Sequence, residues 1–277
     1  MSTSATPDPK ELDKRCNLFG LQSYLEISWN ESATTEPITP RGELRSVPLT
    51  IRFGITIKGP LGDYILRFFN GRMVQIHMNI EEYPEWCQVT MKSKTITTVI
   101  SREERILDNL LTVHLDVNAP AFQEFGVVIN ASVATITGPL GLIGIINGCE
   151  TEVCPFFRAN YLPLITTDCP NGNVIEAPPG ETTTLTFGVT NYGNGKTKIY
   201  NEINVTEIPE GWALYVTDSV ILDVGERGLV NISVRPPYVS GQGYDEPIKV
   251  RVTPRYADNI EISGPSQNVT FLVYYHP

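Results

Sequence analysis

Hydrophobic and polar residues alternate along much of this chain. Between residues 47 and 58 an apolar side chain occupies every second position from Leu49 onward: Leu49, Ile51, Phe53, Ile55 and Ile57. A period of two places such side chains on one face of an extended strand. The segment 59–62, Gly-Pro-Leu-Gly, then supplies a turn. The chain is therefore predicted to be rich in β-strands.

The same pattern predicts strands in both halves. In the first half they are 21–29, 47–58, 64–69, 73–80, 88–100, 111–117 and 126–137. In the second half they are 182–191, 196–207, 212–216, 219–224, 228–236, 246–256 and 267–275. Short strands with regularly spaced turn signals are typical of an antiparallel sandwich. Residues 101–111 are the exception: Ser101 with Glu104 forms a capping-box pattern and predicts a helix, inserted in a strand connection.

The two halves repeat three segments in the same order. The first pair is Arg-Phe-Gly-Ile-Thr at 52–56 and Thr-Phe-Gly-Val-Thr at 186–190. The second pair is Glu-Tyr-Pro-Glu-Trp at 82–86 and Glu-Ile-Pro-Glu-Gly-Trp at 207–212. The third pair is the predicted strands 111–116 and 230–235. A duplicated unit of this size indicates two similar domains in tandem. We predict an all-β fold of two tandem antiparallel Ig-like β-sandwiches, with Trp86 and Trp212 buried at equivalent core positions.

The predicted domains are separated by a long connector. Residues 1–20 form a polar tail, 21–148 the first sandwich, 149–179 the connector and 180–277 the second sandwich. The connector contains apolar residues that a free linker would lack: Phe156, Phe157, Tyr161, Leu162, Leu164 and Ile165. We expect these side chains to be buried between the domains and to fix the interdomain angle.

The second copy resembles a known module. Thr190-Asn191-Tyr192-Gly193, the turn Ile208-Pro209-Glu210-Gly211-Trp212, Leu222-Asp223-Val224-Gly225-Glu226 and Val234-Arg235-Pro236-Pro237 carry the resemblance. They are similar to the Ig-like domain appended to α-galactosidases and common in prokaryotic, especially archaeal, cell-surface proteins. The resemblance covers about residues 175–275 and extends to the first copy only through the internal repeat. It implies a β-sandwich whose turn Trp lies in the core, without catalytic residues.

An uncharged segment, 138–148, precedes the connector. Its apolar side chains make it a candidate interaction loop: Leu140, Leu142, Ile143, Ile145 and Ile146. One interpretation is a buried crossover against the interdomain junction. The other is a loop tip that inserts into a membrane or caps a partner's groove.

Charge and cysteine content narrow the class of protein. The net charge is −10, from 31 acidic and 21 basic residues, and this balance argues against nucleic acid as a partner. Of five cysteines, Cys149 and Cys154 are predicted to form a disulfide that closes a small loop. The spacing does not fit a zinc site, so no metal is expected. The pairing of Cys16, Cys87 and Cys169 stays open.

Sequons indicate an extracellular location. Asn-x-Ser/Thr occurs at Asn30, Asn130, Asn204, Asn231 and Asn268, more often than expected by chance. The alternative is that Asn and Thr are simply common on β-rich surfaces. The first ten residues lack a signal-peptide pattern, and no apolar run is long enough to span a bilayer. We expect a signal and a membrane anchor, and hence membrane association, to lie outside this chain.

Motifs for catalysis are missing from the sequence. It has no nucleophile elbow, zinc-protease motif, phosphate loop or dinucleotide fingerprint, and only three histidines, His77, His114 and His276. We therefore expect that the protein is not an enzyme and that it binds no cofactor. The predicted function is a non-catalytic extracellular structural or interaction protein of archaeal type, the ectodomain of an anchored cell-surface protein, with other surface proteins or glycans as partners and an open oligomeric state.

Two alternatives remain. The chain is an accessory carbohydrate-binding module of a larger glycoside hydrolase, which requires a strip of exposed aromatic residues such as Tyr192, Tyr200, Tyr238 and Tyr244. Or it is a membrane-engaging surface protein that uses the segment 138–148.

Overall fold

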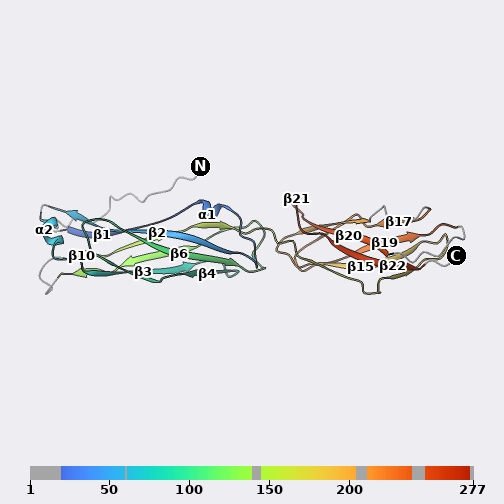
Figure 1. Ribbon diagram of the computed structural model, residues 1–277, viewed down its shortest axis with the longest axis horizontal. Helices are drawn as coiled ribbons and strands as arrows, with labels where there is room; N and C mark the ends of the chain where they lie inside the picture. Colours follow the sequence, from blue (N-terminus) through green and yellow to red (C-terminus); the bar gives the residue numbers. More distant parts are fainter. Residues whose placement is uncertain (1–19, 60, 139–144, 204–210, 239–246, 275–277) are drawn as a thin grey trace.

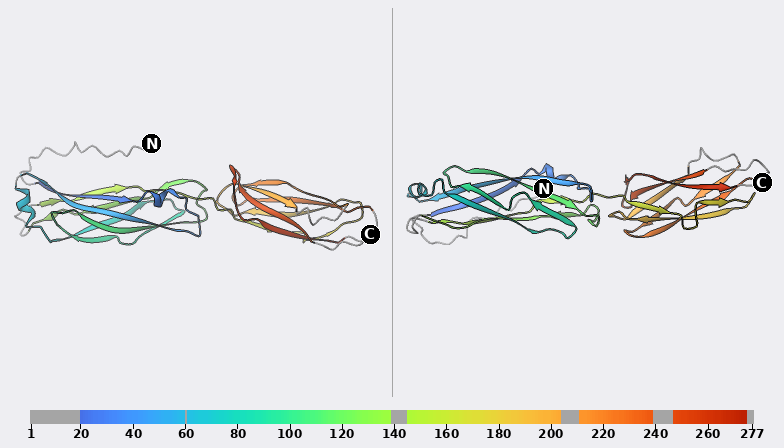
Figure 2. Two further views of the ribbon diagram at one scale, coloured as in Figure 1. Left: turned by 45° about the horizontal axis from the view of Figure 1, so that its top comes forward. Right: turned by 60° about the horizontal axis from the view of Figure 1, so that its bottom comes forward.

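The computed structural model describes residues 20–59, 61–138, 145–203, 211–238 and 247–274. It is an elongated molecule in which two β-sandwiches lie end to end (Figure 1). The two further views show the same arrangement, with a single narrow junction between the domains (Figure 2). The predicted all-β fold of two tandem antiparallel Ig-like sandwiches is confirmed by the strand pairing.

The first domain contains two main sheets. The larger has the strand order β4-β6-β2-β1-β10-β9, with bounds β1 Gly20–Trp29, β2 Leu44–Lys58, β4 Cys87–Met91, β6 Arg105–Leu115, β9 Ile136–Thr137 and β10 Ile145–Asn147. The second has the order β11-β8-β3-β5, with bounds β3 Met73–Glu82, β5 Thr95–Val99, β8 Val128–Val133 and β11 Cys149–Val153. A separate pair joins β7 Glu124–Gly126 to β12 Phe156–Arg158, and the helices are α1 Ser32–Thr35 and α2 Gly62–Leu66.

The second domain also contains two sheets. One has the order β13-β15-β19-β17, with bounds β13 Ile165–Asp168, β15 Thr183–Asn191, β17 Ala213–Val216 and β19 Arg227–Arg235. The other has the order β14-β22-β20-β16-β18, with bounds β14 Val174–Glu176, β16 Thr197–Ile203, β18 Ser219–Leu222, β20 Pro247–Tyr256 and β22 Gln267–Tyr274. Strand β21, Asn259–Ser263, pairs with β20.

The strand topology is repeated in the two domains. The path β4-β6-β2-β1 corresponds in order to β17-β19-β15-β13, and β11-β8-β3-β5 corresponds to β22-β20-β16-β18. Where the structure describes them, the three repeated sequence segments lie on or just before equivalent strands. Their registers differ, however, because Phe53 lies opposite Arg105 whereas Phe187 lies opposite Val230. The duplication therefore preserves topology more closely than register.

Each domain has its own hydrophobic core. The alternating residues Leu49, Ile51 and Phe53 of β2 point inward and are at most 1% exposed. In the second domain Phe187 and Phe271 are fully buried, with ring centroids 5.8 Å apart. Burying a side chain of this size contributes about 1.5–3 kcal/mol. Two separate cores explain why each domain is a complete sandwich.

Two predicted elements of the first domain are wrong. The predicted helix 101–111 is mostly strand β6, which pairs with β2 over ten residues. The Ser101 hydroxyl accepts a hydrogen bond from the Glu103 amide, so it closes a local turn and does not cap a helix. The predicted strand 64–69 instead contains most of helix α2 and the turn after it.

The expected connector 149–179 is not a separate segment. Strands β11 and β12 pair with β8 and β7 of the first domain, whereas β13 and β14 pair with β15 and β22 of the second. The chain crosses between the domains at residues 160–164. Of its apolar residues, Phe157 is buried in the core of the first domain, Ile165 in the core of the second, and Phe156 is 65% exposed. The expectation that these three side chains are buried between the domains is therefore wrong, whereas Tyr161 is buried at the junction.

Candidate functional site

The interdomain junction is built from three short segments. Residues 119–123 and 158–162 come from the end of the first domain, and the loop 191–197 joins β15 to β16 of the second. Asn191 gives this loop its shape, because its side-chain amide donates to the carbonyls of Gly195, Leu222 and Asp223. The amide of Gly193 donates to the Asn191 side-chain oxygen. The loop is thus held in a form that points toward the first domain.

Asn194 connects this loop to the first domain. It is 5% exposed, and its side-chain nitrogen donates to the carbonyl oxygens of Ala119 and Asn160, each at 2.8 Å. The Leu162 amide donates to its side-chain oxygen at 2.6 Å, and the Ala121 amide donates to its backbone carbonyl at 3.1 Å. A buried amide with these partners holds both domains and the crossing segment in one arrangement.

Aromatic side chains pack around Asn194. The ring of Tyr256 lies 5.0 Å from that of Phe122 and 5.2 Å from that of Tyr161. The hydroxyl of Tyr161 hydrogen-bonds to that of Thr197 at 2.8 Å, and burial raises the pKa of Tyr161. The guanidinium of Arg158 lies 5.1 Å from the Phe122 ring centroid, a cation–π distance. The junction is therefore a small mixed core that excludes free rotation.

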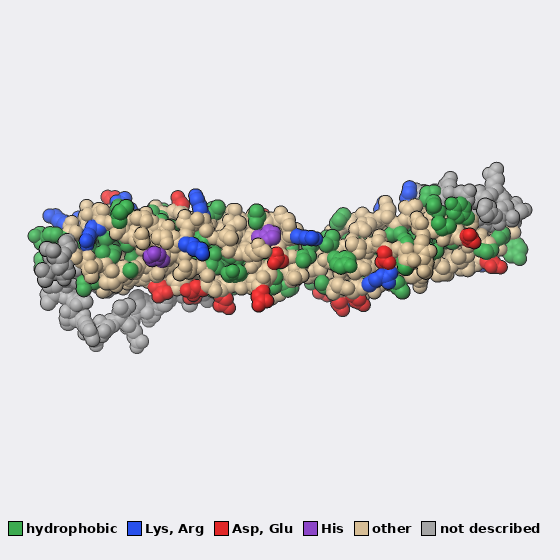
Figure 3. All heavy atoms as spheres, turned by 90° about the horizontal axis from the view of Figure 1, so that it is seen from below, with side chains coloured by type: hydrophobic (Ala, Val, Ile, Leu, Met, Phe, Trp, Pro, Cys, Tyr) green, Lys and Arg blue, Asp and Glu red, His purple; other side chains and the backbone are tan. Residues whose placement is uncertain are grey.

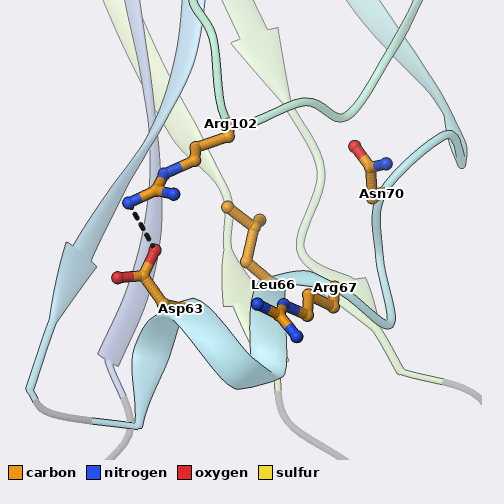
Figure 4. Close-up of a pocket in the computed structure, with 5 residues that line it drawn as sticks. All are labelled: Asp63, Leu66, Arg67, Asn70 and Arg102. Carbon is orange, nitrogen blue, oxygen red and sulfur yellow. Dashed lines mark ion pairs between the residues drawn. The ribbon is translucent and has the colours of Figure 1, made fainter.

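A pocket lies at the opposite end of the first domain. Its cavity of about 220 Å³ is lined by Asp63, Leu66, Arg67, Asn70 and Arg102, and we call it the tip pocket. Asp63 and Leu66 lie on helix α2, Arg67 directly follows it, and Asn70 lies in the turn beyond it. Figure 4 shows the two guanidinium groups on either side of Leu66, with Asp63 beside them.

Charge in the tip pocket is partly balanced. Arg102 pairs with Asp63 at 3.3 Å. Among the residues that the structure describes, no carboxylate pairs with Arg67. Leu66 is 3% exposed and forms an apolar floor. The arrangement offers a cation and an amide around an apolar surface, and sequence patterns had not indicated it.

Exposed apolar side chains surround this end of the domain. Tyr64 is 61% exposed and Phe68 is 40% exposed, and their rings pack edge to face at 5.5 Å. Met73 is 77% exposed, and the neighbouring Arg72 donates to the Thr137 carbonyl at 2.8 Å. Figure 3 shows hydrophobic and basic side chains together at this end, whereas basic side chains elsewhere on that face are scattered.

The described flanks of the candidate interaction loop 138–148 lie at this end of the domain and not at the junction. Its residues Leu140, Leu142 and Ile143 lie outside the described residues. Ile145 is 52% exposed, whereas Ile146 is fully buried and lies opposite Leu21 in β1. The buried-crossover interpretation against the junction is therefore wrong for the described flanks, because β1 starts at the end of the domain remote from residues 119–123.

The expected disulfide between Cys149 and Cys154 is not formed. Within the described residues Cys87, Cys149, Cys154 and Cys169 all carry free thiols. Cys149 begins the extended strand β11 and Cys154 follows its end, so their Cα atoms are roughly 15 Å apart. A disulfide requires less than about 7 Å. Burial raises the pKa of both thiols, and raises that of Cys87 to about 12.

The two repeated tryptophans occupy equivalent places. Trp86 and Trp212 each directly precede the edge strand, β4 or β17, of the sheet. Both are half-buried and pack against the core of their own domain, so the expected full burial is not reached. Trp86 packs edge to face on Phe125 with centroids 4.8 Å apart.

The sequon asparagines on strands lie on outer faces. The middle residue of each of these sequons is buried: Ala131 after Asn130, Ile232 after Asn231 and Val269 after Asn268. The Ser or Thr of the sequon follows that buried residue. Because side chains alternate along a strand, both sequon positions point outward. Asn30 is exposed before α1, Asn130 is half-buried, and Asn204 lies outside the described residues.

The candidate aromatic strip does not form on one surface. Tyr192 lies in the junction loop, and Tyr238 packs beside Gly180 at the far end of the second domain. The ring of Tyr200 lies between the charged groups of Lys198 and Arg255, at 4.8 and 5.0 Å. Tyr244 lies outside the described residues.

The described residues contain neither a metal-binding cluster nor a membrane-spanning helix. Over the described ranges, no three His, Cys, Asp or Glu side chains gather closely enough to hold a metal ion. None of the helices in the described part of the chain has the length and apolar character to cross a membrane. His114 is a half-buried strand residue, and His77 contacts Thr95 at 3.4 Å; His276 lies beyond the described residues.

Comparison with known proteins adds little beyond the fold. No family model matches the chain, and no curated protein matches it. An I-band fragment of titin is similar over 91% of this chain and 65% of its own, with 9% identity and a TM-score of 0.32. A protein from Porphyromonas gingivalis covers 91% and 99%, with 11% identity and a TM-score of 0.26. An ASH/PapD-like domain of human CEP192 covers 40% and 83%, with 15% identity and a TM-score of 0.29.

Proposed function

We propose that the chain is a non-catalytic, exported spacer of fixed shape in an anchored cell-surface protein. The buried Asn194 junction carries this proposal. A flexible linker would let each sandwich act independently, whereas this junction sets the direction of one domain relative to the other. A rigid rod of two domains holds whatever lies at its tip at a defined distance from its base.

Two further observations support the surface location. The sequon asparagines Asn30, Asn231 and Asn268 are exposed, so an exported chain would present them to a glycosyltransferase. The turn and strand motifs of residues 175–275 resemble those of modules in prokaryotic, especially archaeal, surface proteins. The free thiols are compatible with export, but the predicted disulfide no longer supports an extracellular location.

Small-angle scattering tests the fixed shape. We expect a narrow distribution of interdomain distances that matches the end-to-end arrangement of Figure 1. A broad distribution, as given by two domains on a free linker, would contradict the spacer.

Expression in a host with N-glycosylation tests the extracellular location. Glycans are expected at Asn231 and Asn268, and a secreted chain without glycans would count against this location.

The two alternatives lead to different experiments. An accessory carbohydrate-binding module would bind neutral polysaccharides through exposed tyrosines, but Tyr192, Tyr200 and Tyr238 are spread over different surfaces. Binding to a polysaccharide panel that is lost on replacing these tyrosines would favour the module. A membrane-engaging protein would float with liposomes through the segment 138–148, of which Ile145 is an exposed apolar residue.

A further inference from the structure

The charged side chains that line the tip pocket are not part of the hydrophobic core of the first domain. The pocket lies at the end of the first domain that is remote from the junction (Figure 1). Its charged side chains are exposed, because Arg102 and Asp63 retain 78% and 59% of their side-chain surface. Exposed ion pairs of this kind contribute little to the stability of a fold. A cluster that stabilises the fold so little is available for binding.

We propose that the tip pocket binds a uronic acid residue of a surface glycan. This proposal rests on the proposed function, because it names the partner held at the end of the spacer. Binding itself is a property of the isolated chain and does not depend on the interdomain angle.

The arginines account for the carboxylate of the ligand. A guanidinium presents paired N–H donors that match the two oxygens of a carboxylate. Arg67 has no carboxylate partner within the described residues, and it faces Arg102 across Leu66 in Figure 4. Asp63 pairs with Arg102 and uses part of its charge. One net positive charge remains, enough to favour a monoanion.

The other lining residues account for a sugar ring. Asn70 and Asp63 supply an amide and a carboxylate, which donate to and accept from hydroxyl groups. Leu66 gives an apolar floor for the C–H face of the ring. The aromatic pair Tyr64 and Phe68 packs edge to face nearby but does not line the pocket.

Pocket size limits the ligand to one residue. Its volume of about 220 Å³ falls below the roughly 300–1,000 Å³ of pockets that enclose drug-sized molecules. A single pyranose ring with one carboxylate fits such a space, and the remainder of a glycan would extend outward over the exposed end of the domain. An acidic peptide side chain would use the arginines but would leave Asn70 unused.

Amide NMR titration of the whole chain tests the proposal. The probes are the methyl glycosides of glucuronic and galacturonic acid, together with methyl glucoside and methyl galactoside, in which CH₂OH replaces the carboxylate. We expect at least one acid to shift amides of residues 61–70 and 101–103 in a saturable way. The matching neutral glycoside is expected to bind about 10-fold or more weakly, since a bidentate charged contact is lost.

Two variants make the assignment specific. Arg67→Gln is expected to weaken binding of the acid about 10-fold and to leave the neutral sugar unchanged. Asp63→Asn is expected to strengthen binding of the acid severalfold, because Arg102 is released from its ion pair. Arg251→Gln is the matched control: it removes the same charge from an exposed position on β20 of the second domain, and we expect no effect.

Several results would overturn the proposal. They are equal binding of acid and neutral sugars, no binding of either acid, shifts confined to another surface, and affinity that Arg67→Gln does not change. Binding of N-acetyl glutamate amide as tight as that of the uronic acids would indicate a peptide site instead. If neither acid binds but the distribution of interdomain distances is narrow, the glycan-binding proposal is refuted while the spacer function still stands.

Discussion

Replacing Asn194 by alanine should uncouple the two domains. The substitution removes the two hydrogen bonds to the carbonyls of Ala119 and Asn160 and the one from the Leu162 amide. Each hydrogen bond contributes about 0.5–1.5 kcal/mol net, and buried groups left without a partner add to the cost. We therefore expect the docking free energy to fall by about 3–5 kcal/mol. That corresponds to a docked fraction reduced about 10²-fold or more relative to open forms.

Small-angle scattering and calorimetry measure this change together. The Asn194→Ala variant should show a broader distribution of interdomain distances than the unmodified chain. Its thermal unfolding should separate into two transitions, because each sandwich has its own core and loses only the stabilisation from its neighbour. Circular dichroism should show the same strand content, since Asn194 pairs with no strand of either sheet.

Asn201 provides the matched control. It is also 5% exposed, but its side-chain nitrogen donates to the Thr217 carbonyl inside the second domain. Asn201→Ala should therefore lower the melting temperature of the second domain and leave the interdomain distances narrow. If Asn194→Ala keeps the narrow distribution, or if Asn201→Ala broadens it to the same extent, the junction does not depend on Asn194.

Three further changes test separate parts of the structure. Trp212→Ala should cost about 2–4 kcal/mol in urea unfolding, less than full burial implies because the indole is half-buried; a cost under 1 kcal/mol would place it outside the core. Alkylation of the unfolded chain without reductant should label both Cys149 and Cys154, and a peptide linked through them would refute the strand geometry. Burial acts to raise the pKa of Glu43, but hydrogen bonds from the Thr39 amide and from Arg45 outweigh it and lower that pKa. The lowered pKa of Glu43 in the folded state adds stability at pH values above its unfolded-state pKa, and this stability is lost as the pH falls through the folded-state pKa. Glu43→Gln should therefore cost more stability at pH 7 than at pH 3. Equal costs at the two pH values would exclude the linkage.

Alternation predicted the strands of the second domain well. The predicted segments 182–191, 212–216 and 228–236 match β15, β17 and β19 to within one residue at each end. These strands have one face on the core and one in solvent, so a period of two is visible in the sequence. The topology of the repeat was also accessible, because its segments kept their order along the chain.

Local signals failed where tertiary pairing decided the structure. Residues 101–111 contain helix-forming residues and a capping pattern, yet ten pairs with β2 hold 105–114 as a strand. Propensity differences of a few tenths of a kcal/mol per residue do not compete with a full sheet neighbour. The polar Asn109 points into this core and is satisfied there by the backbone of Ser93, an arrangement that periodicity does not reveal.

The junction depends on contacts between residues far apart in sequence, which explains why only part of it was foreseen. Apolar residues of the crossing region, such as Tyr161, indicated a packed junction. The decisive residue, Asn194, lies in a Gly-rich turn where Asn normally signals a local loop. Its partners at 119 and 160 become neighbours only when both sandwiches are complete. A polar residue in a turn that is short of local hydrogen bonds is thus a signal for docking. The tip pocket shows the same limit of sequence-based prediction, because its Arg102 comes from a loop distant in sequence and pairs with Asp63 of helix α2.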